Sequence, residues 1–203
     1  MDKLIQDALI LWATVDPIGT MAIFAGLTAG LSAAERRRTA TRTILYAGGV
    51  LVGSIVVGQI ILTAMGVRLI SFQLGGGIIL FLFGLQMIFG MPYRQMHGEA
   101  EHDIAVFPLA IPGTATPGAI LAVILLTNNH IHSIPVQIGT TLVTLAVLAI
   151  TWIMLLFSER IINVIGTGGA SILTKIMGMI LAAFSVELVM NAVGVQQWLG
   201  QTP

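Results

Sequence analysis

A carboxylic acid next to a helix-breaking residue lies in the middle of the first apolar segment of the chain. Asp16 and Pro17 are inside the run 4–27, and Gly19 and Thr20 follow them. A charge at the centre of a bilayer costs on the order of 3 kcal/mol or more unless it is paired or faces water, so such an acid is a candidate for a functional site. Pro17 lacks a backbone N–H and disfavours helical geometry at Asp16. We therefore expect a broken membrane helix with an acid at the break.

A second interruption lies at 112–118, inside another apolar run, with the sequence PGTATPG. It offers the hydroxyl groups of Thr114 and Thr116, and it ends with Pro117 and Gly118. Broken helices at corresponding places in the two halves of a chain are typical of the binding sites of secondary transporters. Unwound backbone within a membrane is tolerated only where protein or a water-filled cavity lines it. The two breaks are therefore expected to face each other inside the helical bundle.

The chemistry available at two such breaks suits a small zwitterion. Half-helices that begin at Ile18 and Ala119 would direct their positive N-termini at an anion. Asp16 and the carbonyl groups before each break would favour a cation. A site with both properties predicts an amino-acid-like ligand, with Asp16 bound to the ammonium group or to a coupling proton. The alternative role for Asp16 is to cap the following half-helix through the amide of Ile18 or Gly19.

Two groups of residues are assigned to this site. Eight residues at the breaks are assigned to substrate binding, namely Asp16, Pro17, Gly19, Thr20, Thr114, Thr116, Pro117 and Gly118. Glu187, Gln86 and Asn191 are assigned to coupling or to support of the site, because Glu187 is the second acid placed deep in a span and Gln86 is its counterpart in the other half. Glu187 fits two roles equally: a structural hydrogen-bond partner kept protonated by desolvation, or a carboxyl group that exchanges a proton with each side.

Other polar clusters give no comparable signal. A loop at 96–103 holds His97 and His102 among carboxylates, and a shorter loop holds His130 and His132. Neither spacing fixes a coordination geometry, so we predict no metal site and no cofactor. The chain has no cysteine, which excludes disulfides and thiolate chemistry. No nucleophile–base pair can be placed in the membrane, so a membrane enzyme is disfavoured.

The composition requires a membrane environment. Of the 203 residues, 56% are hydrophobic and only 9% are charged, and the mean hydropathy is +0.97, whereas a soluble domain carries about 25% charged residues. The formal net charge is zero, so nothing indicates a nucleic-acid partner. Asp2, Asp7 and the interruption at Asp16 argue against a cleavable signal peptide. We expect an all-α, polytopic protein whose partners are the lipid bilayer, a small zwitterion and a proton, with the oligomeric state left open.

Six apolar segments are long enough to span a bilayer. They are predicted at 4–28, 41–66, 72–91, 104–127, 136–157 and 173–195, and the first and fourth are the broken ones. Ser32 and Glu35 form a capping-box pattern, which predicts that the second helix begins in water. Gly49 and Gly53 permit close helix contact in the second span.

The two halves of the chain are related in sequence. The identical pairs are Gly77 and Gly178, Ile79 and Ile180, Leu80 and Leu181, Phe83 and Phe184, and, at nearly the same offset, Pro17 and Pro117. Each half holds three spans, so the second half must enter the membrane in the opposite direction. The pattern predicts two inverted three-helix repeats, at 1–95 and 104–203, joined by a cytoplasmic linker loop at 96–103.

Basic residues gather on one side of this arrangement. The first, third and fifth loops hold Arg36, Arg37, Arg38, Arg42, Arg94, Arg160 and Lys175. The opposite side has only Lys3 and Arg68. The positive-inside rule therefore places both termini outside, in the periplasm. The arginine cluster is first a determinant of topology, and contact with anionic lipid is a second role.

These motifs together are similar to those of one family of membrane proteins. The chain resembles the MarC family (UPF0056), which includes small neutral amino acid transporters of the SnatA type and lies within the LysE-like superfamily. The resemblance rests on DPIGT at 16–20 with ERR at 35–37, on GGGIIL at 75–80, on FPLAIPGTATPG at 107–118 and on the segment 175–188. It implies six spans in a prokaryotic inner membrane and proton-coupled transport of glycine-like or alanine-like substrates.

The leading hypothesis is therefore a secondary transporter of small neutral amino acids with its site at the two breaks. One alternative is an exporter of another small solute or ion with the same architecture. The other is a membrane scaffold or signalling subunit that transports nothing. The direction of transport, the coupling ion and any contact between Asp16 and Glu187 are left open by the sequence.

Overall fold

The computed structural model describes residues 2–90, 103–129 and 131–195, which form an all-helical bundle. The elements in chain order are α1 (Asp2–Val15), α2 (Pro17–Leu27), α3 (Ala33–Ala64), α4 (Leu69–Phe89), η2 (Ala105–Thr114), α5 (Pro117–Leu126), α6 (Ile134–Leu156) and α7 (Ser158–Val193). Arg94, His97, His102, His130 and nearly all of the predicted linker at 96–103 lie outside the described residues.

The prediction of an all-helical, multi-pass membrane protein is confirmed. In the described part of the chain, five helical segments are long and apolar enough to cross a membrane, and the bent pair η2–α5 raises the number to as many as six. α5 is the most enclosed of these segments, since seven of its ten residues are buried. The broken segments therefore lie inside the bundle, while many large apolar side chains of α3, α4, α6 and α7 face outward.

The start of the second span agrees with its capping box. The Ser32 hydroxyl accepts a hydrogen bond from the Glu35 amide at 3.3 Å, and the Ser32 amide donates to the Glu35 carboxylate at 2.9 Å. These two bonds satisfy backbone groups that a helix N-terminus leaves without intrahelical partners. α3 accordingly begins at Ala33, so its first turns carry the arginine cluster.

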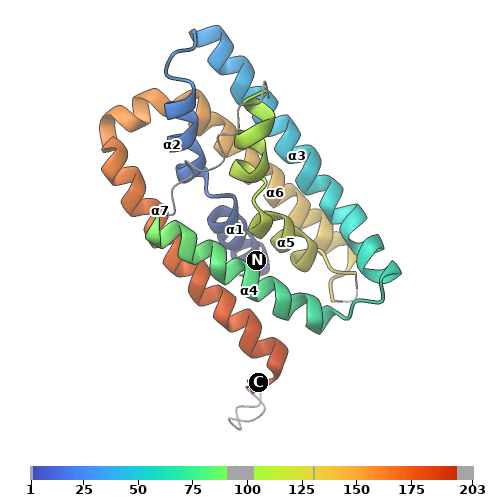
Figure 1. Cartoon of the computed structure of the whole chain (residues 1–203). Helices are drawn as coiled ribbons and strands as arrows, with labels where there is room; N and C mark the ends of the chain where they lie inside the picture. The colour runs from blue at the N-terminus through green and yellow to red at the C-terminus, as the bar shows by residue number, and fades with distance from the viewer. Residues whose placement is uncertain (1, 91–102, 130, 196–203) are drawn as a thin grey trace.

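The connection between the last two spans differs from the prediction. The sequence predicts a loop between 157 and 173, where glycines are frequent, but α7 is assigned over Ser158–Val193. The direction of the chain changes at Gly166, whose φ of 69° and ψ of 164° are non-helical, and glycine adopts such angles at little steric cost. Figure 1 shows the resulting bend at the upper left of the view. Two single-residue interruptions, at Phe157 and at Gly166, therefore lie where we expected a loop.

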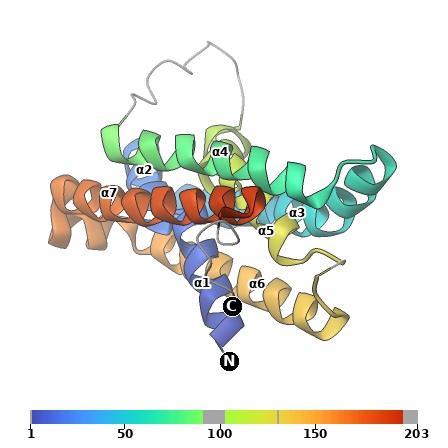
Figure 2. The same ribbon diagram turned by 90° about the horizontal axis from the view of Figure 1, so that it is seen from below.

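α4 and α7 lie side by side and run antiparallel (Figures 1 and 2). Their glycines allow the two backbones to approach closely. A Cβ atom on Gly84 would lie 2.9 Å from the carbonyl oxygen of Gly178, and one on Gly77 would lie 3.1 Å from that of Ser185. Small residues permit such contacts between membrane helices, so this pair forms one wall of the bundle.

The prediction of a close helix contact at Gly49 and Gly53 was wrong. No atom of another element lies within 4 Å of a Cβ placed on either residue. α3 approaches α5 instead at Gly58, where a Cβ would lie 2.7 Å from the Ile124 side chain. Glycine spacing alone does not say which face of a helix meets a neighbour, and here the 49/53 face points away from the bundle.

Gly84→Ala is expected to destabilise the protein by about 1–3 kcal/mol, because the added methyl group meets the backbone of α7 and the two helices must separate. Gly49→Ala is the matched control and should leave stability unchanged or raise it by up to about 1 kcal/mol through helix propensity. Thermal unfolding in detergent micelles measures both changes. Equal melting temperatures for the two variants would contradict the packing at Gly84.

Candidate functional site

The first break consists of one residue between α1 and α2. Asp16 has left-handed backbone angles, with φ 47° and ψ 68°, and is only 7% exposed. Its carboxylate accepts a hydrogen bond from the Gly19 amide at 3.0 Å and so caps α2. Pro17 begins α2 and has no N–H for the Ala13 carbonyl. The capping role considered for Asp16 is therefore present, and it leaves a carboxyl group enclosed at the break.

Gly19 gives the carboxylate its space. A Cβ atom on Gly19 would lie 2.0 Å from Asp16 Oδ2, so any side chain at this position would force the carboxyl group to move. The main-chain hydrogen bonds continue across the break, from the Asp16 amide to the Trp12 carbonyl at 3.1 Å and from the Thr20 amide to the Asp16 carbonyl at 2.9 Å. The first span is therefore interrupted over a very short distance.

The second break is longer and more irregular. Phe107 and Ile111 have extended backbone angles inside η2, because each precedes a proline and that neighbour disfavours helical geometry. η2 and α5 are bent by 54° relative to each other. Thr116 caps α5 by accepting a hydrogen bond from the Ala119 amide at 2.8 Å, and Pro117 follows as the first helical residue.

The two breaks repeat one local design. In each, a side-chain oxygen at the cap, Asp16 or Thr116, accepts a hydrogen bond from the amide three residues later. In each, the residue after the cap is proline, which suits the first position of a helix because its missing N–H has no intrahelical partner there. The half-helices therefore begin at Pro17 and Pro117, slightly earlier than the predicted starts at Ile18 and Ala119.

Two hydrogen bonds join the breaks directly. The Thr116 hydroxyl donates to the Thr14 carbonyl at 2.7 Å, and the Thr20 hydroxyl donates to the Gly113 carbonyl at 2.9 Å. Each break thus satisfies a carbonyl oxygen of the other. Thr14, Thr20, Thr114 and Thr116 are all buried, and the Thr114 hydroxyl donates to the Leu109 carbonyl at 2.9 Å. The structure brings the two breaks together in an enclosed polar cluster.

The remaining substrate-binding candidates lie at the edges of this cluster. Pro17 and Gly118 are buried, Gly19 is half-buried, and Pro117 is exposed. A Cβ on Gly118 would lie 3.0 Å from the Leu80 side chain and 3.3 Å from that of Phe83. Gly118 therefore lets α4 approach the N-terminus of α5.

A cavity of about 450 Å³ lies beside the breaks rather than between them. None of the eight candidates contributes to its lining, although Glu187 and Asn191 do. Ile10, Leu80 and Ala122 are among its apolar wall residues. The cavity therefore lies toward α4 and α7, while the two breaks are joined to each other by hydrogen bonds.

Glu187 is less enclosed than predicted. Its side chain is exposed on α7, where the Asn191 amide group donates a hydrogen bond to it at 3.1 Å. Gln86, its counterpart in the first half, is also exposed and does not line the cavity. The depth of a residue in a span does not give its direction around the helix, and that direction decides whether it faces the bundle.

A buried ion pair near the N-terminus was missed. Lys3 donates a hydrogen bond to Asp7 Oδ2 at 2.7 Å, and the Thr140 hydroxyl donates to the same oxygen at 2.6 Å. Asp7 is only 1% exposed, so α1 is tied to α6 by a charged group inside the protein. The sequence signal was the spacing of Lys3 and Asp7, which places opposite charges on one helix face.

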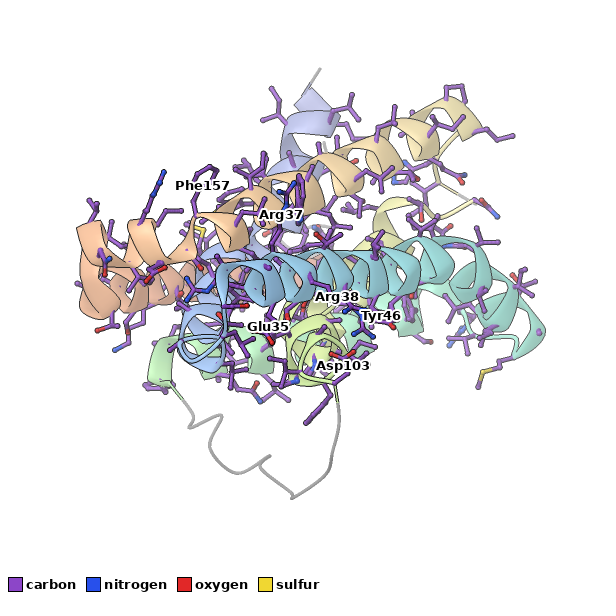
Figure 3. The ribbon with its side chains drawn as sticks, turned by 90° about the horizontal axis from the view of Figure 1, so that it is seen from above. Glu35, Arg37, Arg38, Tyr46, Asp103 and Phe157 are labelled. Atoms are coloured by element: carbon purple, nitrogen blue, oxygen red, sulfur yellow. The ribbon has the colours of Figure 1, made fainter. Side chains whose placement is uncertain are left out.

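The arginine cluster also binds neighbouring elements. Arg42 forms an ion pair with Asp103, and its guanidinium lies 5.9 Å from the centre of the Tyr46 ring. Figure 3 shows Tyr46 and Asp103 close together beside the arginine-rich end of α3. Arg36 forms an ion pair with Glu159 of α7. The cluster therefore contributes to packing at this end of the bundle, in addition to the topological role predicted for it.

Helical segments with apolar outer surfaces, two of them interrupted at a proline, define a polytopic integral membrane protein. The sequence pattern of a family described as "MarC family integral membrane protein" matches residues 1–198 of this chain. The chain belongs to the MarC family.

Curated relatives match over nearly their full lengths. A UPF0056 membrane protein of Buchnera aphidicola is 30% identical over 98% of each chain. The UPF0056 membrane protein MJ1677 of Methanocaldococcus jannaschii is 33% identical over 90% of this chain and 92% of its own. The UPF0056 inner membrane protein MarC of Citrobacter koseri is 27% identical over 91% of this chain and 90% of its own. No solved structure matches the chain significantly.

Thr116→Val is expected to destabilise the protein by about 1–3 kcal/mol, because the Ala119 amide loses its cap and the buried Thr14 carbonyl loses its donor. Thr116→Ser keeps the hydroxyl and should recover most of this loss. Thermal unfolding in detergent measures the difference. A Thr116→Val protein as stable as the serine variant would argue against the hydrogen bond between the breaks.

Proposed function

We propose that the protein is a secondary transporter of small neutral amino acids, of the SnatA type within the LysE-like superfamily. The observation that carries the proposal is the direct contact of two capped helix breaks around a buried carboxyl group. α2 and α5 both begin at these breaks, and helix N-termini favour anions. Asp16 favours a cation, so a ligand that carries one charge of each sign suits the region.

An exchange of hydrogen bonds explains how the closed site would accept such a ligand. At present Asp16 accepts from the Gly19 amide. In the proposed bound state the substrate carboxylate takes that amide, and Asp16 turns to the substrate ammonium or releases and binds the coupling proton. The hydroxyls of Thr20 and Thr116 leave their carbonyl partners in the opposite break and contact the ligand. The Gly19 amide, Asp16 and the two hydroxyls each gain a partner in the ligand, which offsets part of the free-energy cost of opening.

The proposed architecture is a pair of inverted three-helix repeats, 1–95 and 104–203, joined by the linker at 96–103. Two observations support it. The caps at Asp16 and Thr116 have the same design. The contacts between α4 and α7 are also reciprocal. Gly77 contacts Ser185, and Gly84 contacts Gly178. At the offset of 101 residues between the halves, Gly77 corresponds to Gly178 and Gly84 corresponds to Ser185, so each residue contacts the counterpart of the other. Inverted repeats of this kind support alternating access to one central site.

Asp16→Asn is expected to lower the uptake of labelled glycine into proteoliposomes about tenfold or more, because a hydrogen bond to a charged group contributes about 1.5–3 kcal/mol. Asparagine tolerates the left-handed backbone angles at this position, and its side-chain oxygen can still accept from the Gly19 amide. The variant should therefore fold normally. Glu35→Gln removes a surface carboxylate while keeping a residue suited to the capping box, and it should transport like the unmodified protein.

Several outcomes would contradict this proposal. Wild-type protein that shows no glycine or alanine uptake or exchange above empty vesicles, under either a proton or a sodium gradient, would count against amino acid transport. A shift in melting temperature caused by a different small solute, absent in Asp16→Asn, would instead favour the exporter alternative. Uptake by Asp16→Asn at the wild-type rate would remove Asp16 from the site.

The proposed topology has both termini outside, and the absence of cysteine makes it directly testable. In right-side-out membrane vesicles, an impermeant maleimide should label Ser133→Cys in the α5–α6 connection. It should label Ala34→Cys at the start of α3 only after the membrane is permeabilised. Both positions are exposed, so differences in labelling reflect the side of the membrane. The reverse pattern would invert the predicted orientation.

A further inference from the structure

The cavity beside the breaks has a polar lining that the proposed central site does not use. It lies between α1, α4, α5 and α7 and extends to the connection that follows α5. Its polar lining residues are Lys3, Gln6, Asp7, Gln73, His132, Glu187 and Asn191. Its volume of about 450 Å³ is within the range of small-molecule sites, and it exceeds what an amino acid needs, so water would share it.

The charges in this cavity favour a ligand with an ammonium group. Lys3 and Asp7 neutralise each other as an ion pair, and Glu187 adds a further acid to the lining. The pKa of His132 is lowered, first by its partial burial and then by the nearby Lys3 ammonium, with Asp7 acting in the opposite direction. With His132 neutral, the lining residues that the structure describes carry one net negative formal charge.

A thin apolar layer separates the cavity from the breaks. Ile10 lines the cavity one helical turn before Thr14, whose carbonyl receives the hydrogen bond from the opposite break. Ala122 lines it one turn after Gly118. Leu80 is fully buried, lines the cavity and lies against Gly118 on its other side. One layer of side chains therefore divides the cavity from the proposed central site.

We propose that this cavity is a second, outer binding site for the amino acid zwitterion, occupied before the ligand reaches the breaks. The inference rests on the proposed transport function, which supplies the ligand class. The substrate ammonium is held by Glu187 and Asp7, and its carboxylate is held by Lys3. Lys3 also approaches the Leu126 carbonyl and the Thr140 hydroxyl, each at 3.5 Å, so other groups retain its position when Asp7 contacts the ligand.

Single cysteines in the cysteine-free chain test this site. Gln73→Cys and Asn191→Cys place a thiol on α4 and on α7, on two walls of the cavity. In proteoliposomes, a cationic methanethiosulfonate should modify both about fivefold faster than an anionic one, as expected for one nearby negative charge. Glycine at millimolar concentration should slow the reaction at both positions. Adding Glu187→Gln to Gln73→Cys should remove the preference for the cationic reagent.

Two controls separate this effect from general surface charge and access. Ser133→Cys is exposed near the same end of the bundle but does not line the cavity, so glycine should not protect it. Glu159→Gln removes an equal charge from the opposite end of α7 and should leave the reagent preference unchanged. Equal rates with both reagents at Gln73→Cys and Asn191→Cys, without protection by glycine, would overturn the outer site.

Glycine uptake measured in the same proteoliposomes distinguishes this inference from the proposed function. Uptake without protection of either cysteine overturns the outer site and leaves transport standing. Protection without uptake supports the outer site as a glycine-binding cavity and counts against transport. Protection at both positions together with uptake supports both proposals.

Discussion

The structure depends on the requirement that backbone groups freed at a helix break find partners away from water. In a membrane an unsatisfied carbonyl or amide costs several kcal/mol, on the order of the penalty for burying any unpaired polar group. This protein meets the requirement by hydrogen bonds from each break to the other. The Thr116 hydroxyl donates to the Thr14 carbonyl, and the Thr20 hydroxyl donates to the Gly113 carbonyl. Neither interrupted segment could occupy the bundle interior alone. The enclosed polar cluster and the central positions of α1, α2 and α5 all follow from that mutual satisfaction.

The closed breaks and the neighbouring cavity lie next to each other and share wall residues. Leu80 contacts both regions, and Ile10 and Ala122 connect the cavity wall to helical turns that end at the breaks. α4 and α7, which carry Leu80 and Glu187, are packed through glycines with almost no spare space between their backbones. Separation of these two helices would open voids at every glycine contact. A movement of this wall therefore costs less free energy when α4 and α7 shift together.

Much of this arrangement could be predicted from the sequence because it depends on local chemistry. Prolines and capping side chains act over a few residues, so both breaks, the cap at Asp16 and the start of α3 followed from residue type. The side toward which a helical residue points depends on neighbours in space. For that reason Glu187 was expected to be more enclosed than it is, Gly49 and Gly53 were given a contact that is absent, and Asp7 was not recognised as buried. The glycine-rich corner at Gly166 was mistaken for a loop because local composition does not show that helices resume directly on either side.

The caps of α2 and α5 share their geometry but differ in charge. One is a carboxyl group and the other is a hydroxyl group, so two breaks with the same capping geometry differ in the charge that they can carry. In the proposed complex, a ligand with a positive and a negative end would therefore direct its positive end toward Asp16 in the first break. A capping geometry that the two breaks share thereby acquires a polarity from one difference in side-chain chemistry, a carboxyl group in the first break and a hydroxyl group in the second.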